Sequence, residues 1–242
     1  MTKPGKKYRA ASAKVDPDKL YEPREALGLV RETSYTKFDG TVELHVRLGV
    51  DPRHAEQQVR DTVLLPNGLG KKVRVLVFAE GDAARTATEA GADIIGDDQI
   101  IQRIKDGWLE FDATVATPEM MGKIGKSGLG RILGTRGLMP NPKAGTVVPA
   151  GDLPRVIKEL KAGRVEFRVD KTGNMHVPIG KASFDADQLY GNMAALMEAV
   201  KRARPASAKG SFIKKVTVTS TMGPGVKIDP TRLRPGVDES AA

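Results

Sequence analysis

The 242-residue sequence contains no cysteine, one tryptophan and only 5% aromatic residues. Without cysteine the chain cannot form disulfides, hold metal through thiolates or use a thiolate nucleophile. Its three histidines, His45, His54 and His176, show no ligand spacing such as HExxH, so we expect no metal site and assign His45 and His54 to ordinary solvated or hydrogen-bonded positions. No apolar run approaches the length of a bilayer span, and the first twenty residues have no apolar signal-peptide core. We therefore expect a chain that is neither exported nor inserted into a membrane.

Positive charge is in excess and unevenly distributed. Lys and Arg number 39 against 30 Asp and Glu, which gives a net charge of +9 and favours a polyanionic partner. Residues 1–68 and 163–242 together carry +7, whereas residues 69–162 carry +2. Within these parts, 123–143 and 201–215 contain basic but no acidic residues, while 80–112 contains nine acidic and three basic ones. A nucleic acid should therefore avoid 80–112.

The two ends of the chain have the pattern of an antiparallel sheet with helices. The stretch TVELHVRLGV at 41–50 alternates apolar and polar residues, which indicates a strand with one solvated face. Residues 164–179 predict a hairpin in which Gly173 supplies the positive φ of the turn. A helix beginning at Pro23, a helix from Asp185 and a strand over 211–222 complete this part. We interpret residues 1–19 and 229–242 as loose tails.

The middle of the chain alternates short apolar strands with helices. Strands are predicted at 73–79, 92–96 and 111–118, with helices near 82–90, after Asp97 and from Asp152 to Gly163. This order favours a small parallel sheet with helices on its faces. Because neither flank is long enough to fold comfortably alone, we predict a discontinuous α+β domain from 1–68 and 163–242, carrying an inserted α/β domain at 69–162.

The glycine-rich stretch at 125–145, GKSGLGRILGTRGLMPNPKAG, does not fit the known phosphate-binding or nucleophile motifs. A Walker loop requires glycine at position 120, where this chain has Met120. The dinucleotide pattern fails because Gly134 stands one position late and the stretch follows the third strand. Ser127 lacks the second glycine of a nucleophile elbow. We interpret the stretch as a basic loop, either structural or in contact with RNA.

A more promising group of residues lies in the flanks. Alternation over 211–222 places Lys215 and three threonines on one face and Val216, Val218 and Met222 on the other. Hydroxyl and guanidinium groups contact phosphate and ribose, and a turn aromatic can pack on a base, so the mixture suits structured RNA. Threonines are also common in ordinary strands. The candidate residues on the strand, hairpin and turn are Thr217, Thr219, Thr221, Arg164, Arg168, Lys171, His176, Lys37 and Phe38.

Five segments, TKFDGTVELHVRLGVDP, LPNGLGKKVRVLVFA, GRILGTRGLMPNPKAGTV, KAGRVEFRVDKTGNMHVPIGKASF and TSTMGPGVKI, resemble a known family. They are similar in sequence and order to the bacterial first-numbered ribosomal proteins of the large subunit, which form a mobile stalk beside the tRNA exit site. The resemblance covers about residues 20–228. It implies a domain made from both chain ends and a Rossmann-like, three-layer insert. Thr135 and Lys215 depart from the pattern, where we expect proline and a small hydroxyl residue.

The resemblance also implies a function. We expect binding to the stalk region of large-subunit ribosomal RNA, participation in release of deacylated tRNA from the exit site, and repression of the messenger RNA of the protein's own operon. We expect no enzymatic activity, no cofactor and a monomer within the cytoplasmic ribosome. The RNA-binding positions implied by the family are Lys37, Phe38, Thr41, Arg164, Arg168, His176, Thr221, Met222 and Gly223.

Two alternatives explain less of the sequence. A nucleotide-dependent enzyme would need a phosphate loop or a catalytic cluster, and neither pattern is present. A protein that coats DNA or RNA generally would show repetitive basic stretches and little sequence preference. Both alternatives differ from the family in the partner they predict, so a binding titration separates them.

Overall fold

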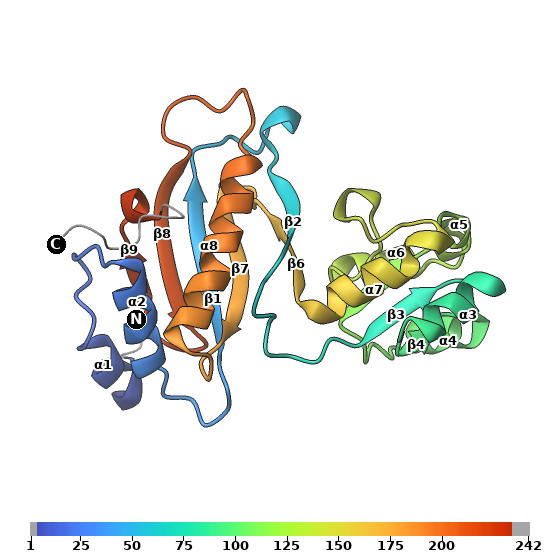
Figure 1. Ribbon diagram of the computed structural model, residues 1–242, viewed down its shortest axis with the longest axis horizontal. Helices are drawn as coiled ribbons and strands as arrows, with labels where there is room; N and C mark the ends of the chain where they lie inside the picture. Colours follow the sequence, from blue (N-terminus) through green and yellow to red (C-terminus); the bar gives the residue numbers. More distant parts are fainter. Residues whose placement is uncertain (1–3, 234–242) are drawn as a thin grey trace. The chain divides into compact units, whose positions relative to one another are not determined.

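A computed structural model describes residues 4–233 of the chain, which separate into two compact units (Figure 1). One unit contains the chain up to Gly70 and again from Val165, and the other contains Lys71–Arg164. Each unit buries hydrophobic clusters composed of its own residues alone. Within 4–233 no helix is both long enough and apolar enough to cross a bilayer.

The first unit is built on a four-stranded sheet in the order β7-β1-β8-β9, with every neighbouring pair antiparallel. Strand β1 (Thr41–Leu48) is central and alternates as predicted, with every second side chain buried. Its partners are β7 (Asn174–Lys181) and β8 (Ile213–Ser220), and β9 (Val226–Ile228) extends the sheet beyond β8. The polar residues of these strands therefore share one face of the sheet.

Two helices cover the apolar face of this sheet (Figure 1). Helix α2 (Pro23–Glu32) packs on β8 and β9, and α8 (Ala186–Arg202) packs on α2 and β7. Helix α8 follows Asp185, where the sequence predicts a helix start, and Asp185 and Gln188 form a capping box there. Its stripe of Leu189, Met193, Leu196 and Val200 is buried in the core.

The predicted hairpin over 164–179 is wrong in its pairing. Strand β6 (Arg164–Arg168) pairs with β2 (Arg60–Leu64) in a separate two-stranded sheet, and only the isolated bridge between Val169 and Met175 joins its end to β7. The turn itself is correct, since Gly173 has φ +83°. Strands β6 and β7 separate on either side of the turn because β7 pairs with β1, whereas β6 pairs with β2.

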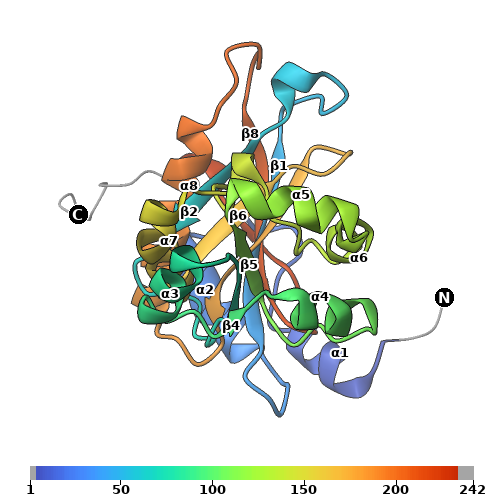
Figure 2. The same ribbon diagram turned by 90° about the vertical axis from the view of Figure 1, so that its right-hand side faces the viewer.

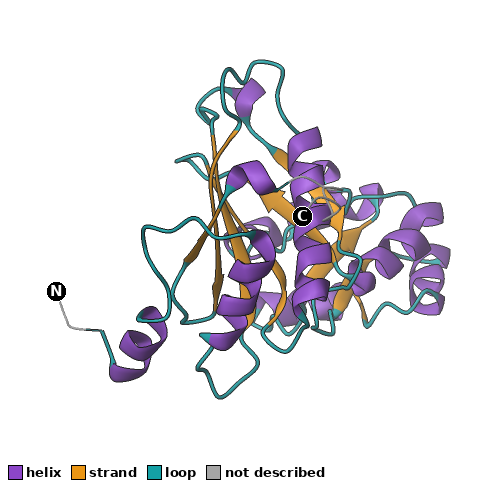
Figure 3. Ribbon diagram, turned by 60° about the vertical axis from the view of Figure 1, so that its left-hand side comes forward, coloured by secondary structure: helices purple, strands orange, loops and turns teal. Residues whose placement is uncertain are grey.

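The N-terminal tail prediction is also wrong for the described residues. Residues Lys6–Ser12 form helix α1, visible next to the N-terminal label in Figure 3. Ala11 and Val15 are buried, and the hydroxyl of Tyr21 accepts a hydrogen bond from the backbone of Asp16 at 2.8 Å. At the other end, the 3-10 turn Pro230–Arg232 leads to the buried Leu233, and the remainder of that predicted tail lies outside the described residues.

The second unit has a parallel sheet in the order β4-β3-β5 between two groups of helices (Figure 2). Val75 and Val77 of β3 face one apolar cluster, while Leu76 and Phe78 face the other. The strands are β3 (Val75–Phe78), β4 (Ile94–Ile95) and β5 (Ala113–Ala116). One face of the sheet is covered by α3 (Asp82–Glu89) and α7 (Leu153–Ala162). The other face is covered by α4 (Asp98–Lys105), α5 (Pro118–Lys126) and α6 (Leu129–Thr135).

The glycine-rich stretch is mostly helical up to Thr135, where the loop prediction is wrong, and mostly irregular after it. Helix α5 ends at Lys126, Gly128 adopts the left-handed conformation at φ +77°, and α6 follows with Leu129 and Leu133 buried. The two leucines recur with helical spacing, which outweighs the low helix propensity of the surrounding glycines. Thr135 ends α6 and donates its hydroxyl to the carbonyl of Ile132 at 3.0 Å.

Candidate nucleic-acid interface

The solvated face of the four-stranded sheet is the candidate interface. The register of the strands aligns residues in rows across this face. One row contains His176, His45, Thr217 and Lys227, and the next row contains Asn174, Arg47 and Lys215. Both helices of the sheet pack on the opposite side. Strand β1 alone spans roughly 24 Å at 3.4 Å per antiparallel residue, so this open face offers an extended surface.

The open face is mainly basic. Arg47, Lys215 and Lys227 are exposed, and within residues 4–233 none of them forms an ion pair. Glu43 is the carboxylate on the same face of β1. Unpaired, exposed cations on an open sheet are well placed to neutralise phosphates.

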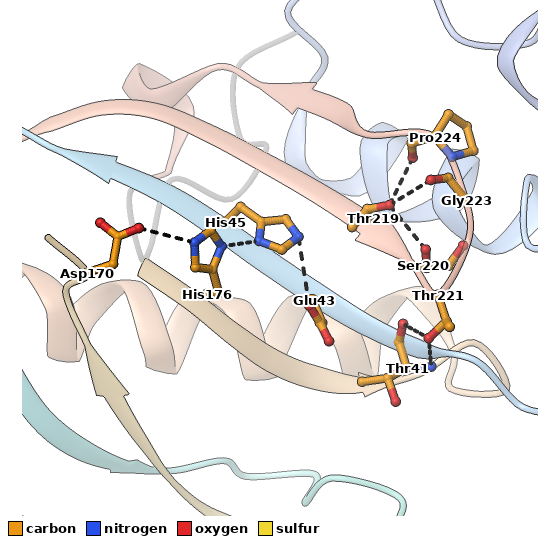
Figure 4. A network of polar contacts seen from close by, with 10 residues as sticks. All are labelled: Thr41, Glu43, His45, Asp170, His176, Thr219, Ser220, Thr221, Gly223 and Pro224. Atoms are coloured by element: carbon orange, nitrogen blue, oxygen red, sulfur yellow. Dashed lines mark hydrogen bonds and ion pairs between the residues drawn. The ribbon is translucent and has the colours of Figure 1, made fainter. Parts of the chain in front are cut away.

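One end of the open face is closed by a corner formed by the turns before β1 and after β8. The hydroxyl of Thr221 accepts from the backbone N–H of Thr41 at 2.9 Å and lies 3.2 Å from its carbonyl oxygen (Figure 4). The backbone N–H of Thr221 also donates to that carbonyl at 2.9 Å. We expected the Thr221 hydroxyl to point at a ligand, and it instead joins the two strands.

Met222 does not follow the alternation predicted for it. Strand β8 ends at Ser220, and Met222 adopts φ +64° with 68% of its surface exposed. The hydroxyl of Tyr35 donates to the carbonyl of Met222 at 2.8 Å and so fixes the turn. Phe38, in the turn that contains Tyr35, is 61% exposed. The corner therefore presents two apolar side chains to solvent, with Lys37 exposed beside them.

The remaining residues of the corner support its backbone. The hydroxyl of Thr219 is within 3.2 Å of the carbonyls of Gly223 and Pro224, so it is used internally (Figure 4). A Cβ at Gly223 would overlap the hydroxyl of the buried Ser220. A residue with a Cβ at position 223 would therefore force Ser220 to move. Tyr35 and Ser220 were missed by sequence reasoning, since neither belongs to a charged or alternating pattern.

The opposite end of the open face is formed by the turn between β6 and β7. Asp170 accepts hydrogen bonds from the backbone of Thr172 and Asn174, both at 2.8 Å. Burial raises the pKa of Asp170, but these hydrogen bonds and that of the Thr172 hydroxyl outweigh it and bring the pKa to about 2. The ionised carboxylate thus holds the turn that carries Arg168 and Lys171.

A cavity of about 810 Å³ lies beside this turn, lined in part by Arg168 and Lys171. Its other wall contains Pro52, Arg53 and Gln58, which follow β1. Sequence reasoning missed these three residues because they lie in an irregular segment. The cavity combines three cations and the carboxylate of Asp170 with apolar surface from Pro52 and Val169. Because the cations are in excess, this combination is suited to a phosphate and the sugar or base next to it.

His45 and His176 face each other across β1 and β7, with their Nδ1 atoms 2.7 Å apart. Burial lowers the pKa of His45 and the neighbouring His176 lowers it further, while Glu43 opposes the shift. Within residues 4–233 no group of three or more histidine and carboxylate side chains has metal-binding geometry. His54 lies outside this pair, at 3.9 Å from Asp51.

Arg164 does not belong to this group of residues. Its guanidinium donates to Glu159 at 3.0 Å and to the carbonyl of Ala144 at 2.9 Å, and its side chain is only 13% exposed. All these partners lie in the Lys71–Arg164 unit. The other predicted site residues lie in the first unit, on the open face or in the turns at its two ends.

Comparison with known proteins gives a consistent result over almost the whole sequence. The family described as "Ribosomal protein L1p/L10e family" matches residues 30–224. The chain is 63% identical over 231 residues to the large ribosomal subunit protein uL1 of Chloroflexus aurantiacus, covering 95% of this chain and 97% of the relative. It is 62% identical over 230 residues to uL1 of Chloroflexus aggregans, with 95% and 96% covered. The uL1 of Syntrophobacter fumaroxidans is 55% identical over 234 residues, with 97% and 98% covered.

Proposed function

Because this chain belongs to the ribosomal protein L1p/L10e family, we propose that it binds the stalk region of large-subunit ribosomal RNA through the open face and its two ends. Family membership makes it a structural protein of the large ribosomal subunit, rather than an enzyme, and gives it a place in the cytoplasmic ribosome. Binding to the stalk RNA goes further than this role in the large subunit and is the specific part of the proposal.

The observation that carries the proposal is the composition of the open face. Exposed cations that form no ion pair with any described residue lie on the sheet, and an apolar corner of Phe38 and Met222 lies at one end. Phosphates bind the cations, while an unstacked base or a sugar packs on the apolar corner. A rigid sheet holds both kinds of group at fixed separation, which favours a folded RNA over an extended strand.

The resemblance supports two further roles as part of the same proposal. The protein represses its own operon messenger when that messenger carries a structure like the stalk site. Since one surface serves both RNAs, ribosomal and messenger RNA exclude each other, and free protein represses only when ribosomal sites are filled. The protein, a monomer within the ribosome, also takes part in release of deacylated tRNA from the exit site.

An equilibrium titration at fixed pH tests the proposal. Stalk RNA and a scrambled hairpin of equal length and composition are titrated at several salt concentrations. We expect the stalk RNA to bind more tightly throughout, and the logarithm of its affinity to fall linearly with the logarithm of salt as counterions are released. Equal affinity for both RNAs at every salt concentration would refute the proposal and favour a general coating protein.

A further inference from the structure

A chain of four titratable groups crosses the middle of the open face (Figure 4). His45 Nε2 lies 3.9 Å from a carboxylate oxygen of Glu43, and His176 Nε2 lies 3.8 Å from one of Asp170. The two imidazoles meet through their Nδ1 atoms at 2.7 Å. The groups come from β1, β7 and the turn before β7, so the fold of the sheet brings them together.

The contacts among these four groups favour one added proton over none, because each Nε2 atom lies at ion-pair distance from a carboxylate. Two neutral imidazoles form the Nδ1–Nδ1 hydrogen bond only when one ring carries its hydrogen on Nδ1 and donates, while the other carries it on Nε2 and accepts. The donor ring then has a bare Nε2, whose lone pair faces a carboxylate. At one end of this row of four groups, the Nε2 lone pair then faces a carboxylate oxygen, and neither atom carries a hydrogen.

One added proton removes this mismatch. Both Nε2 atoms then carry hydrogen and face Glu43 and Asp170, while the Nδ1–H···Nδ1 bond between the rings persists. A second proton would place two N–H groups against each other at 2.7 Å. The pair can therefore take up one proton but not two, and this uptake belongs to the pair rather than to either residue.

We propose that RNA binding to the open face is coupled to the uptake of one proton by the His45–His176 pair. This inference rests on the proposed RNA-binding function. The charged groups around the pair are Glu43 and Arg47 on β1, Lys215 on β8, Lys227 on β9 and Asp170 in the turn before β7. Adding a proton reduces the charge of the four-group chain from −2 to −1, and a polyanion binds more favourably to the less negative surface.

Nuclear magnetic resonance of the free protein tests the shared proton without RNA. Imidazole ¹⁵N shifts of His45 and His176, recorded from about pH 8 to 5, should change together in one step of one proton. In His176→Gln this joint step should disappear. Two independent steps that leave both rings protonated would overturn the shared-proton site.

The coupling itself is measured by titrating stalk RNA at constant salt over the same pH range. We expect affinity to rise as pH falls, by at most about tenfold per pH unit, which is the limit for one proton. Calorimetry in two buffers of different ionisation enthalpy should show fractional uptake approaching one proton on binding. His176→Gln should remove most of this dependence, and the matched control His54→Gln should retain it.

The outcomes separate this inference from the proposed function. Failure of stalk RNA to bind preferentially at any pH would refute the function and the coupling together. Preferential binding with the same pH dependence in His176→Gln as in the parent would refute the coupling alone. Preferential binding with a pH dependence lost only in His176→Gln, and kept in His54→Gln, supports both.

Discussion

At the scale of single residues, Met222 joins an exposed apolar side chain to a left-handed backbone. The left-handed conformation costs a non-glycine residue about 1–2 kcal/mol. The hydrogen bond from Tyr35 holds the turn in this strained form. Backbone strain of this kind is typical of functional sites, where a side chain is presented at the expense of stability. The strain at Met222 therefore supports our proposal that this corner contacts the RNA.

Replacement of Met222 by glycine should therefore separate stability from binding. Glycine adopts positive φ without strain, so the free energy of unfolding should stay equal or rise by up to about 1 kcal/mol. Affinity for stalk RNA should fall by about 3- to 30-fold because the apolar contact is lost. Urea unfolding and RNA titration measure the two effects. Leu20→Ser, which removes another exposed apolar side chain, is the control and should bind like the parent.

Thr221→Val should weaken the corner from within. The substitution leaves the backbone N–H of Thr41 without its acceptor, which costs about 1–3 kcal/mol of stability. RNA affinity should fall with it, since the turns before β1 and after β8 lose one of the hydrogen bonds that join them. Thr221→Ser keeps the hydroxyl and should restore both values. Equal unfolding curves for Thr221→Val and the parent would contradict this account.

At the scale of elements, the accuracy of sequence reasoning depended on whether a pattern was local. The alternation of β1 and the stripe of α8 follow from single segments, and both are confirmed. The partner of β6 is not local, because β2 lies about 100 residues earlier, and the hairpin rule selected the wrong neighbour. Helix α1 was missed because only one of its residues, Ala11, is buried.

The candidate site was predicted in the same uneven way. Its strands and the turn at Gly173 were identified, but the internal use of the Thr219 and Thr221 hydroxyls depends on chain segments that meet only in the folded sheet. Met222 was misplaced because alternation was extended past the end of β8. A sequence pattern indicates which side chains are polar, while the fold determines whether they remain available.

In the second unit, Asp112 joins the starts of β3 and β5. Its carboxylate accepts from Lys71 and from the backbone and guanidinium of Arg74, both of the latter at 3.1 Å. Burial raises the pKa of Asp112, but these donors outweigh it and bring the pKa to about 2. A lowered pKa stabilises the fold above the unfolded value near 3.8, and this stabilisation disappears as pH falls through about 2.

Asp112→Asn should consequently destabilise this unit by about 1–2 kcal/mol at pH 7, after allowance for the solvent exposure of its cations. The difference from the parent should vanish between about pH 4 and 2. The single tryptophan, Trp108, packs near Phe111 in this unit, so its fluorescence reports the unfolding there. Glu110→Gln is a charge-matched control and should show no comparable loss.

At the scale of the whole molecule, the two units have separate cores and different charges. The largest cluster contains only residues before Gly70 and after Val165, whereas two smaller clusters lie within 71–164. Divided at these boundaries, the sequence gives net charges of +6 and +3. Strands β2 and β6, which lead into and out of the second unit, are paired with each other. The first unit therefore forms its sheets and its core without residues of the second unit.

Replacing 71–164 by a short Gly/Ser linker should leave a folded protein that retains most of its affinity for stalk RNA. Circular dichroism checks the fold and RNA titration checks the binding. In the full chain, Arg131→Ala on α6 should have little effect on affinity, while Lys215→Ala on β8 should lower the salt dependence by about one phosphate contact. Loss of nearly all affinity in a folded deletion variant would move the main site into 71–164.

The pairing of β1 with strands far along the chain also sets the order of events during synthesis. Thr41 bonds to Thr221, 180 residues later, and His45 meets His176, 131 residues later. At about 5–20 residues per second, β1 waits roughly 10 to 40 seconds for its partners, while the 71–164 unit folds around its own core. The candidate interface therefore forms only when translation is nearly finished. If the protein represses its own messenger, as we propose, a nascent chain should be unable to bind the messenger from which it is being translated.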